Sequence, residues 1–129
     1  MARDYTDYPA LSGIYLEDSY VLDIVEEPGG FRFVLEAVLT PERPNYRNPI
    51  SGEQYCYVEA ELIFTNVSAV EWLDRSDRRS GDATGTEDLG NIDALTWADG
   101  VYSAEGDWGI VRIRSSTDPE FVVSARDCR

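Results

Sequence analysis

Residues 20–39 read Tyr20-Val-Leu-Asp-Ile-Val-Glu-Glu-Pro-Gly-Gly-Phe-Arg-Phe-Val-Leu-Glu-Ala-Val-Leu39, and this stretch decides the fold class. Two runs of β-forming residues, 20–26 and 31–39, flank a Pro-Gly-Gly turn signal, which is the pattern of a β-hairpin. Alternation with a period of two assigns the side chains of the first strand to two faces. One face is expected to carry Tyr20, Leu22 and Ile24, and the other Val21, Asp23 and Val25.

Further strands are predicted on both sides of this hairpin. A short strand, residues 13–17, is expected before it, and a proline-rich loop, residues 40–53, after it. Residues 54–64 alternate again, with Cys56, Val58, Ala60, Leu62 and Phe64 on one face. The opposite face carries Glu59 and Glu61, so we expect a half-buried strand with a wet, acidic outer side.

Strands are also predicted throughout the second half of the chain. Ser68 and Glu71 have the spacing of a helix capping box, but the β-forming residues of 67–73 favour a strand. Four more strands are expected at 92–97, 101–105, 110–115 and 121–124, with Gly-containing turns between the first three and Thr117-Asp118-Pro119 before the last. With no long amphipathic helix, the chain is predicted to be one all-β domain over residues 1–129. The expected architecture is an antiparallel sandwich or barrel-like sheet of about eight strands.

The charge of the chain restricts its chemistry and its partners. Twenty-five acidic residues face eleven basic ones, giving a net charge of −14, and every basic residue is Arg. Without His or Lys there is no imidazole base, no Schiff base and no P-loop. An acidic surface repels nucleic acid and anionic membranes, so we expect neither as a partner. A basic protein is the expected partner, while the oligomeric state stays open.

The cysteines and the hydropathy of the chain indicate its cellular location and whether it holds a structural metal. No segment approaches the roughly 20 apolar residues of a membrane helix, and the N-terminal residues lack the apolar run of a secretory signal. Cys56 is expected to be a buried thiol and Cys128 an exposed one, with no disulfide framework. These features favour a bacterial-type cytoplasm, with no cofactor and no structural metal.

The segment from Asp74 to Asp93 is the predicted binding surface. It is longer than a connection between strands requires, and loops of this length are commonly functional. Trp72 at its base is a candidate interface anchor. The acidic residues proposed to meet a basic partner are Asp74, Asp77, Asp82, Glu87 and Asp88. Tyr5, Tyr8 and Tyr46 are further aromatic residues expected at the surface.

Three alternative functions stay open at this stage. The Asp-rich residues 82–93 contain oxygen donors suited to Ca²⁺, although their spacing is not that of an EF-hand. Acidic pairs such as Glu26 and Glu27 or Glu105 and Asp107 have the chemistry of a carboxylate-based hydrolase. An accessory subunit of unknown role is the third alternative. Against these, the absence of a nucleophile elbow and of a His base favours a protein that is not an enzyme.

Three segments carry a resemblance to known proteins: Asp18-Ser-Tyr-Val-Leu22, Leu62-Ile-Phe-Thr-Asn-Val-Ser-Ala-Val-Glu-Trp-Leu73 and Gly106-Asp-Trp-Gly109. In the order of its elements the chain resembles small acidic β-sheet proteins of bacteria, some with the layout of immunity proteins from polymorphic toxin systems. The resemblance implies a role in which the protein neutralises a toxin by contact, with an acidic surface against a basic face. It assigns no site residue to a position in this sequence.

Overall fold

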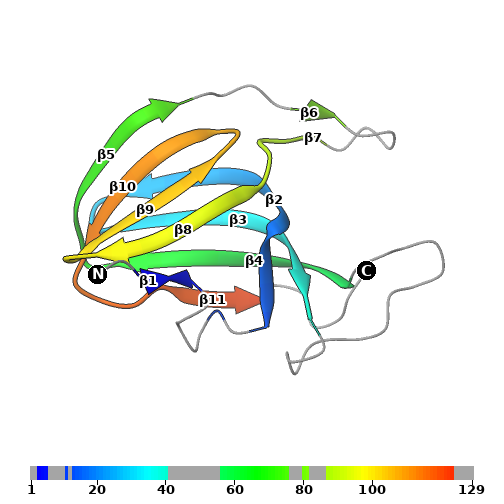
Figure 1. Cartoon of the computed structure of the whole chain (residues 1–129), viewed down its shortest axis with the longest axis horizontal. Helices are drawn as coiled ribbons and strands as arrows, with labels where there is room; N and C mark the ends of the chain where they lie inside the picture. The colour runs from blue at the N-terminus through cyan, green and yellow to red at the C-terminus, as the bar shows by residue number, and fades with distance from the viewer. Residues whose placement is uncertain are drawn as a thin grey trace.

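The computed structural model describes residues 3–5, 11, 13–40, 56–75, 80–81 and 87–123, and these form two antiparallel β-sheets and no α-helix. Figure 1 shows the strands of the two sheets overlying one another. Sheet A has the order β1-β8-β9-β10-β5, sheet B has the order β11-β4-β3-β2, and β6 and β7 form a separate pair. Both main sheets have open edges, so the all-β prediction is confirmed as a sandwich rather than a closed barrel.

The strand bounds follow the predicted segments closely. Sheet A consists of β1 (Arg3–Asp4), β5 (Val67–Arg75), β8 (Ile92–Ala98), β9 (Val101–Gly106) and β10 (Gly109–Ser115). Sheet B consists of β2 (Ile14–Glu27), β3 (Gly30–Leu39), β4 (Cys56–Thr65) and β11 (Glu120–Val123). The short pair is β6 (Ser80–Gly81) and β7 (Glu87–Asp88). Residues 67–73 are therefore a strand, and the predicted strand at 13–17 is the first part of the long β2.

Residues with positive φ occupy several of the connections between these strands. Gly29 has φ +73° in the β2–β3 hairpin, and Asp99 and Gly100 have φ values of 52° and 82° in the β8–β9 hairpin. Two consecutive residues with positive φ make the type I′ turn that suits the twist of a hairpin. Asn66, at φ 50°, stands between β4 in sheet B and β5 in sheet A. This single residue is where the chain passes from one sheet to the other.

The predicted faces of β2 need correction. The ladder pairs Val21 with Leu35 but Asp23 with Val34, so Leu22 is an extra residue in a β-bulge. The extra residue reverses the alternation, and Val21, which is fully buried, and Ile24 both contact the core. The expectation that Val21 and Ile24 lie on opposite faces is therefore wrong.

A second irregularity, between Tyr15 and Tyr20, bends β2 (Figure 1). The buried Ser19 bridges it with its side chain. Its hydroxyl donates to the carbonyl of Tyr15 at 2.7 Å and accepts from the amide of Val38 at 2.9 Å. A hydroxyl therefore takes the place of a missing main-chain partner in the ladder.

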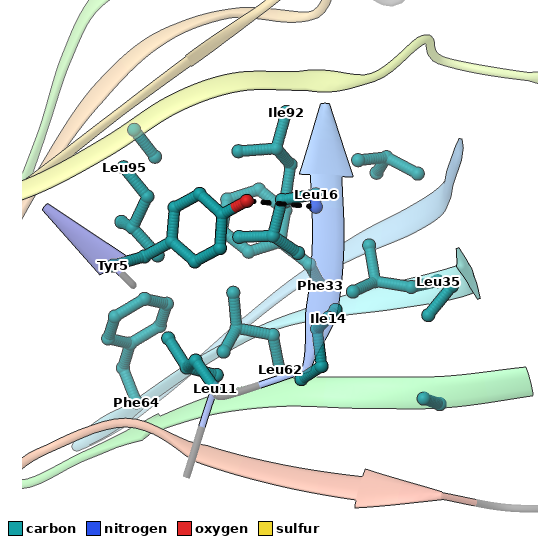
Figure 2. Close-up of a cluster of buried hydrophobic side chains, with 14 of the residues drawn as sticks. Tyr5, Leu11, Ile14, Leu16, Phe33, Leu35, Leu62, Phe64, Ile92 and Leu95 are labelled. Atoms are coloured by element: carbon teal, nitrogen blue, oxygen red, sulfur yellow. Dashed lines mark hydrogen bonds between the residues drawn. The ribbon is translucent and has the colours of Figure 1, made fainter. Parts of the chain in front are cut away.

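The core lies between the sheets and is rich in aromatic rings (Figure 2). Phe33 of β3 contacts Trp108 at a centroid distance of 5.1 Å, and Phe64 of β4 contacts Tyr102 of β9 at the same distance. The predicted inward residues of β4 are confirmed for Val58, Ala60, Leu62 and Phe64, which are at most 1% exposed. The side chain of Cys56 lies outside the described part of the chain, as do Tyr8, Tyr46 and Cys128.

Tyr5 belongs to this core, so the prediction that it is exposed is wrong. The residue is 2% exposed, and its hydroxyl lies beside β2 (Figure 2). That hydroxyl accepts from the amide of Leu16 at 3.3 Å and donates to Glu17 Oε2 at 2.8 Å. A tyrosine can be buried once its polar end has partners, which is the condition met here.

Candidate functional site

The structure describes only part of the predicted binding segment. Asp74 is exposed at the end of β5. Glu87 and Asp88 form β7, which pairs with Ser80 and Gly81, and their side chains lie outside the described part of the chain. Asp77 and Asp82 also lie outside the described residues.

After β7 the chain attaches to sheet B through its backbone. The amide of Leu89 donates to the carbonyl of Val21 at 2.8 Å, and the amide of Val21 donates to the carbonyl of Gly90 at 2.8 Å. Leu89 is buried in the core. The predicted binding segment is thus fixed to β2 at its C-terminal end.

Trp72 occupies a contact between the two sheets. Its Nε1 donates to Glu26 Oε1 on β2 at 3.0 Å, and the Arg75 guanidinium lies 4.3 Å from the centroid of its ring. Arg75 Nη1 also reaches Glu26 Oε2 at 3.3 Å. The inner side of the ring meets Phe31 and Trp108 at 6.2 and 6.0 Å. We call Trp72, Arg75 and Glu26 the Trp72 clasp. Its geometry gives Trp72 a packing role, with its one donor already in use.

Sheet B presents a second acidic surface on its outer side. The ladder places Asp23, Val34, Glu61 and Val122 in one row across the four strands. A neighbouring row consists of Val25, Arg32, Ile63 and Glu120, and a further row contains Tyr20, Glu36 and Glu59. We call these side chains the acidic face. It carries five carboxylates and one guanidinium.

The wet outer side predicted for β4 is confirmed, because Glu59 is exposed and Glu61 half-buried. Sequence reasoning missed the other members of the acidic face. Asp23 and Glu36 come from the β2–β3 hairpin and Glu120 from the distant β11, and the registers of these strands with β4 bring them beside Glu59 and Glu61. Alternation indicated which side chains of β3 and β4 point outward, but in β2 the bulge at Leu22 reverses it, and alternation does not specify cross-strand neighbours.

Arg32 partly neutralises the centre of the acidic face. Its Nη2 lies 3.4 Å from Glu27, and its Nε lies 3.5 Å from Glu61 in an ion pair without hydrogen-bond geometry. Partly exposed ion pairs of this kind contribute about 0–1 kcal/mol. Between the carboxylates lie apolar side chains, of which Val122 is 45% exposed. The surface therefore combines negative charge with apolar contact area.

The acidic side chains of the described residues bear on the hydrolase and metal alternatives. The neighbours Glu26 and Glu27 point to different arginines, Arg75 and Arg32, instead of converging on one space. Among the side chains that the structure describes, no three acidic, Cys or His residues come together as a metal site.

We expect thermal melts to give the same midpoint with Ca²⁺, with EDTA and without either. The physical reason is that Ca²⁺ needs six to eight oxygen ligands, and the acids of residues 82–93 lack the spacing with which an EF-hand supplies them. Differential scanning calorimetry measures the midpoint. A rise of several degrees with Ca²⁺ would establish a cation site in that segment.

Within the described residues no helix has the length and apolar character needed to cross a membrane. Comparisons with protein-family models, curated proteins and solved structures gave no match to this chain.

Proposed function

We propose that this chain is a non-enzymatic binding protein that recognises a basic protein by contact. The observation that carries the proposal is the acidic face, where five carboxylates and several apolar side chains share one four-stranded surface. Complementary charge accelerates encounter and selects among partners, while apolar groups near the centre of an interface supply affinity. A toxin neutralised in a bacterial cytoplasm is the specific partner that the resemblance to immunity proteins supports.

Two surfaces compete for this role. The segment with Asp74, Asp77, Asp82, Glu87 and Asp88 is the sequence-based candidate, and the acidic face is the second. Two features support the acidic face. Its carboxylates lie on paired strands, which fixes their spacing, and apolar side chains lie between them. Trp72, the aromatic anchor proposed for the first surface, is engaged in the clasp.

The test requires a purified partner, which the product of a neighbouring toxin-like reading frame would provide. We expect Glu59→Gln, Glu61→Gln and Glu120→Gln together to slow association about tenfold or more at low salt, with little change in the unfolding midpoint. The wild-type association rate should fall steeply with ionic strength, and that of the triple variant less so. Stopped-flow fluorescence measures both rates.

A matched control distinguishes the effect of the acidic face on association from the effect of net charge. Glu71→Gln, Asp99→Asn and Glu105→Gln remove three exposed carboxylates from sheet A and its β8–β9 turn, all outside the Asp74–Asp93 segment. At about 0.1 M salt, where exposed charges more than roughly 10 Å apart are largely screened, this control is expected to associate within about twofold of wild type. Equal slowing in both triple variants would contradict a localised surface. If only Asp77→Asn, Asp82→Asn and Asp88→Asn together slow association, the contact lies on the loop segment.

A further inference from the structure

The outer side of sheet A contains a hollow of about 490 Å³ on the side of the molecule opposite to the acidic face. It extends over four strands, from β5 across β10 and β9 to β8. The residues that line it are Ala69, Glu71, Thr96, Ala98, Asp99, Val101, Ser103, Arg112 and Arg114. Arg112 and Arg114 alternate with buried residues on β10, so both side chains leave the same face of the sheet.

The neighbours of the two arginines explain why the surface is concave. Arg112 has Ser103 opposite on β9, and Arg114 has Val101 on β9 and Ala69 on β5. Directly opposed side chains on one face are only about 5 Å apart at Cβ, so the short Ser103, Val101 and Ala69 leave open space beside the guanidinium groups. Arg112 also has the longer Glu71 opposite on β5. An exposed sheet face with large neighbours would fill that space.

The arginines of this hollow differ from the others whose side chains the structure describes. Arg32 and Arg75 lie within 3.3–3.5 Å of carboxylates. Arg112 reaches Glu71 only at 3.9 Å, with both side chains more than half exposed. Arg114 is exposed and has no ion pair with any described side chain. In a chain with a net charge of −14, two adjacent cations therefore keep most of their donors available.

We propose that this hollow binds the phosphate group of a small phosphate monoester. Arginine presents a planar fork of N–H donors that matches phosphate oxygens, and its hydrogen bonds to an ionised acceptor are stronger than neutral ones. Positions two apart on a strand are about 7 Å apart, so two long side chains can converge on one group from both sides. Three terminal oxygens give both forks acceptors, whereas one carboxylate satisfies only one fork.

The other residues that line the hollow restrict the charge and the chemistry of the ligand it can bind. Glu71 and Asp99 lie among the lining residues and repel additional negative charge. A single phosphate group can displace the loose contact between Arg112 and Glu71, but a polyanion such as a nucleic-acid strand would meet both acids. Ser103 and Thr96 add hydroxyl donors for the polar part of a small molecule. The volume is within the range of small-molecule pockets.

Phenyl phosphate is the probe for this site, and benzoate is its carboxylate counterpart, both titrated at constant ionic strength. Binding is followed through the Arg Nε–Hε signals by nuclear magnetic resonance. We expect saturable binding of phenyl phosphate with Kd below about 10 mM, and weaker binding of benzoate. Arg114→Gln should weaken binding roughly tenfold or more, since it removes charge-assisted hydrogen bonds.

Two more variants keep the test decisive. Ala69→Leu leaves the charge unchanged but fills the hollow from the exposed edge strand, and should weaken binding roughly tenfold. Arg75→Gln removes one positive charge outside the hollow and should change Kd less than about twofold. The proposal is overturned by absence of binding to the wild type, by tighter binding of benzoate, or by equal weakening in Arg75→Gln. None of these outcomes bears on the acidic face, which lies on the other sheet.

Discussion

Replacing Trp108 by Ala is expected to lower the free energy of unfolding by about 3–5 kcal/mol, the usual cost of truncating a buried aromatic residue. Trp108 is fully buried although it stands in the two-residue turn between β9 and β10. Its ring packs against Phe33 and Trp72, and its Nε1 donates to the carbonyl of Asn91 at 2.9 Å. Urea denaturation followed by circular dichroism measures the loss.

The variant Trp108→Phe separates the contribution of apolar packing from that of the hydrogen bond to Asn91. The phenyl ring keeps apolar contact with the core but loses the donor to Asn91, which leaves a partly buried carbonyl without that bond. We expect a loss of about 1–3 kcal/mol, the cost of an unsatisfied buried group. If Trp108→Ala cost less than about 1 kcal/mol, Trp108 could not hold the core position described here.

Gly109→Ala is expected to have the second-largest effect, a loss of about 2–5 kcal/mol from strain and a backbone clash together. Gly109 has φ +133°, and a Cβ there would collide with the carbonyl oxygen of Asp74 and lie 2.8 Å from the Cα of Arg75. Both atoms belong to the backbone of β5, so the pairing of β10 with β5 must shift. The same denaturation experiment measures the loss.

Gly29→Ala is the matched control for the clash. Gly29 also has positive φ, +73°, but a Cβ there has no atom within 4 Å. Only the conformational cost then applies, about 1–2 kcal/mol. Equal losses in the two variants would show that close approach of β5 to Gly109 is not what requires glycine at that position.

Local signals in the sequence were sufficient to locate most of the strands along the chain. Alternation in residues 31–39 and 56–64 and the turn residues Gly29 and Gly100 act over a few positions, so the chain displays them directly. The preference for a strand over a helix at 67–73 was also a local judgement, and it is confirmed.

The features that sequence reasoning missed depend on contacts between distant segments. The bulge at Leu22 becomes evident only from the register of β2 against β3, and the burial of Tyr5 depends on partners supplied by Leu16 and Glu17. The hydrogen bond between Trp72 and Glu26 was likewise not evident from the sequence, because the two residues lie 46 positions apart. The acidic face and the Arg112–Arg114 hollow likewise arise from cross-strand neighbours, which composition and spacing cannot specify.

The irregular β2 has a consequence for the behaviour of the protein at high concentration. β2 is an edge strand of sheet B, and a long, regular edge offers free amides and carbonyls to another chain. Here the bulge at Leu22 interrupts the edge, and Leu89 and Gly90 already occupy both main-chain groups of Val21. This part of the edge therefore cannot serve as a template for edge-to-edge aggregation. The occupied edge protects a sheet whose inner face is almost entirely apolar.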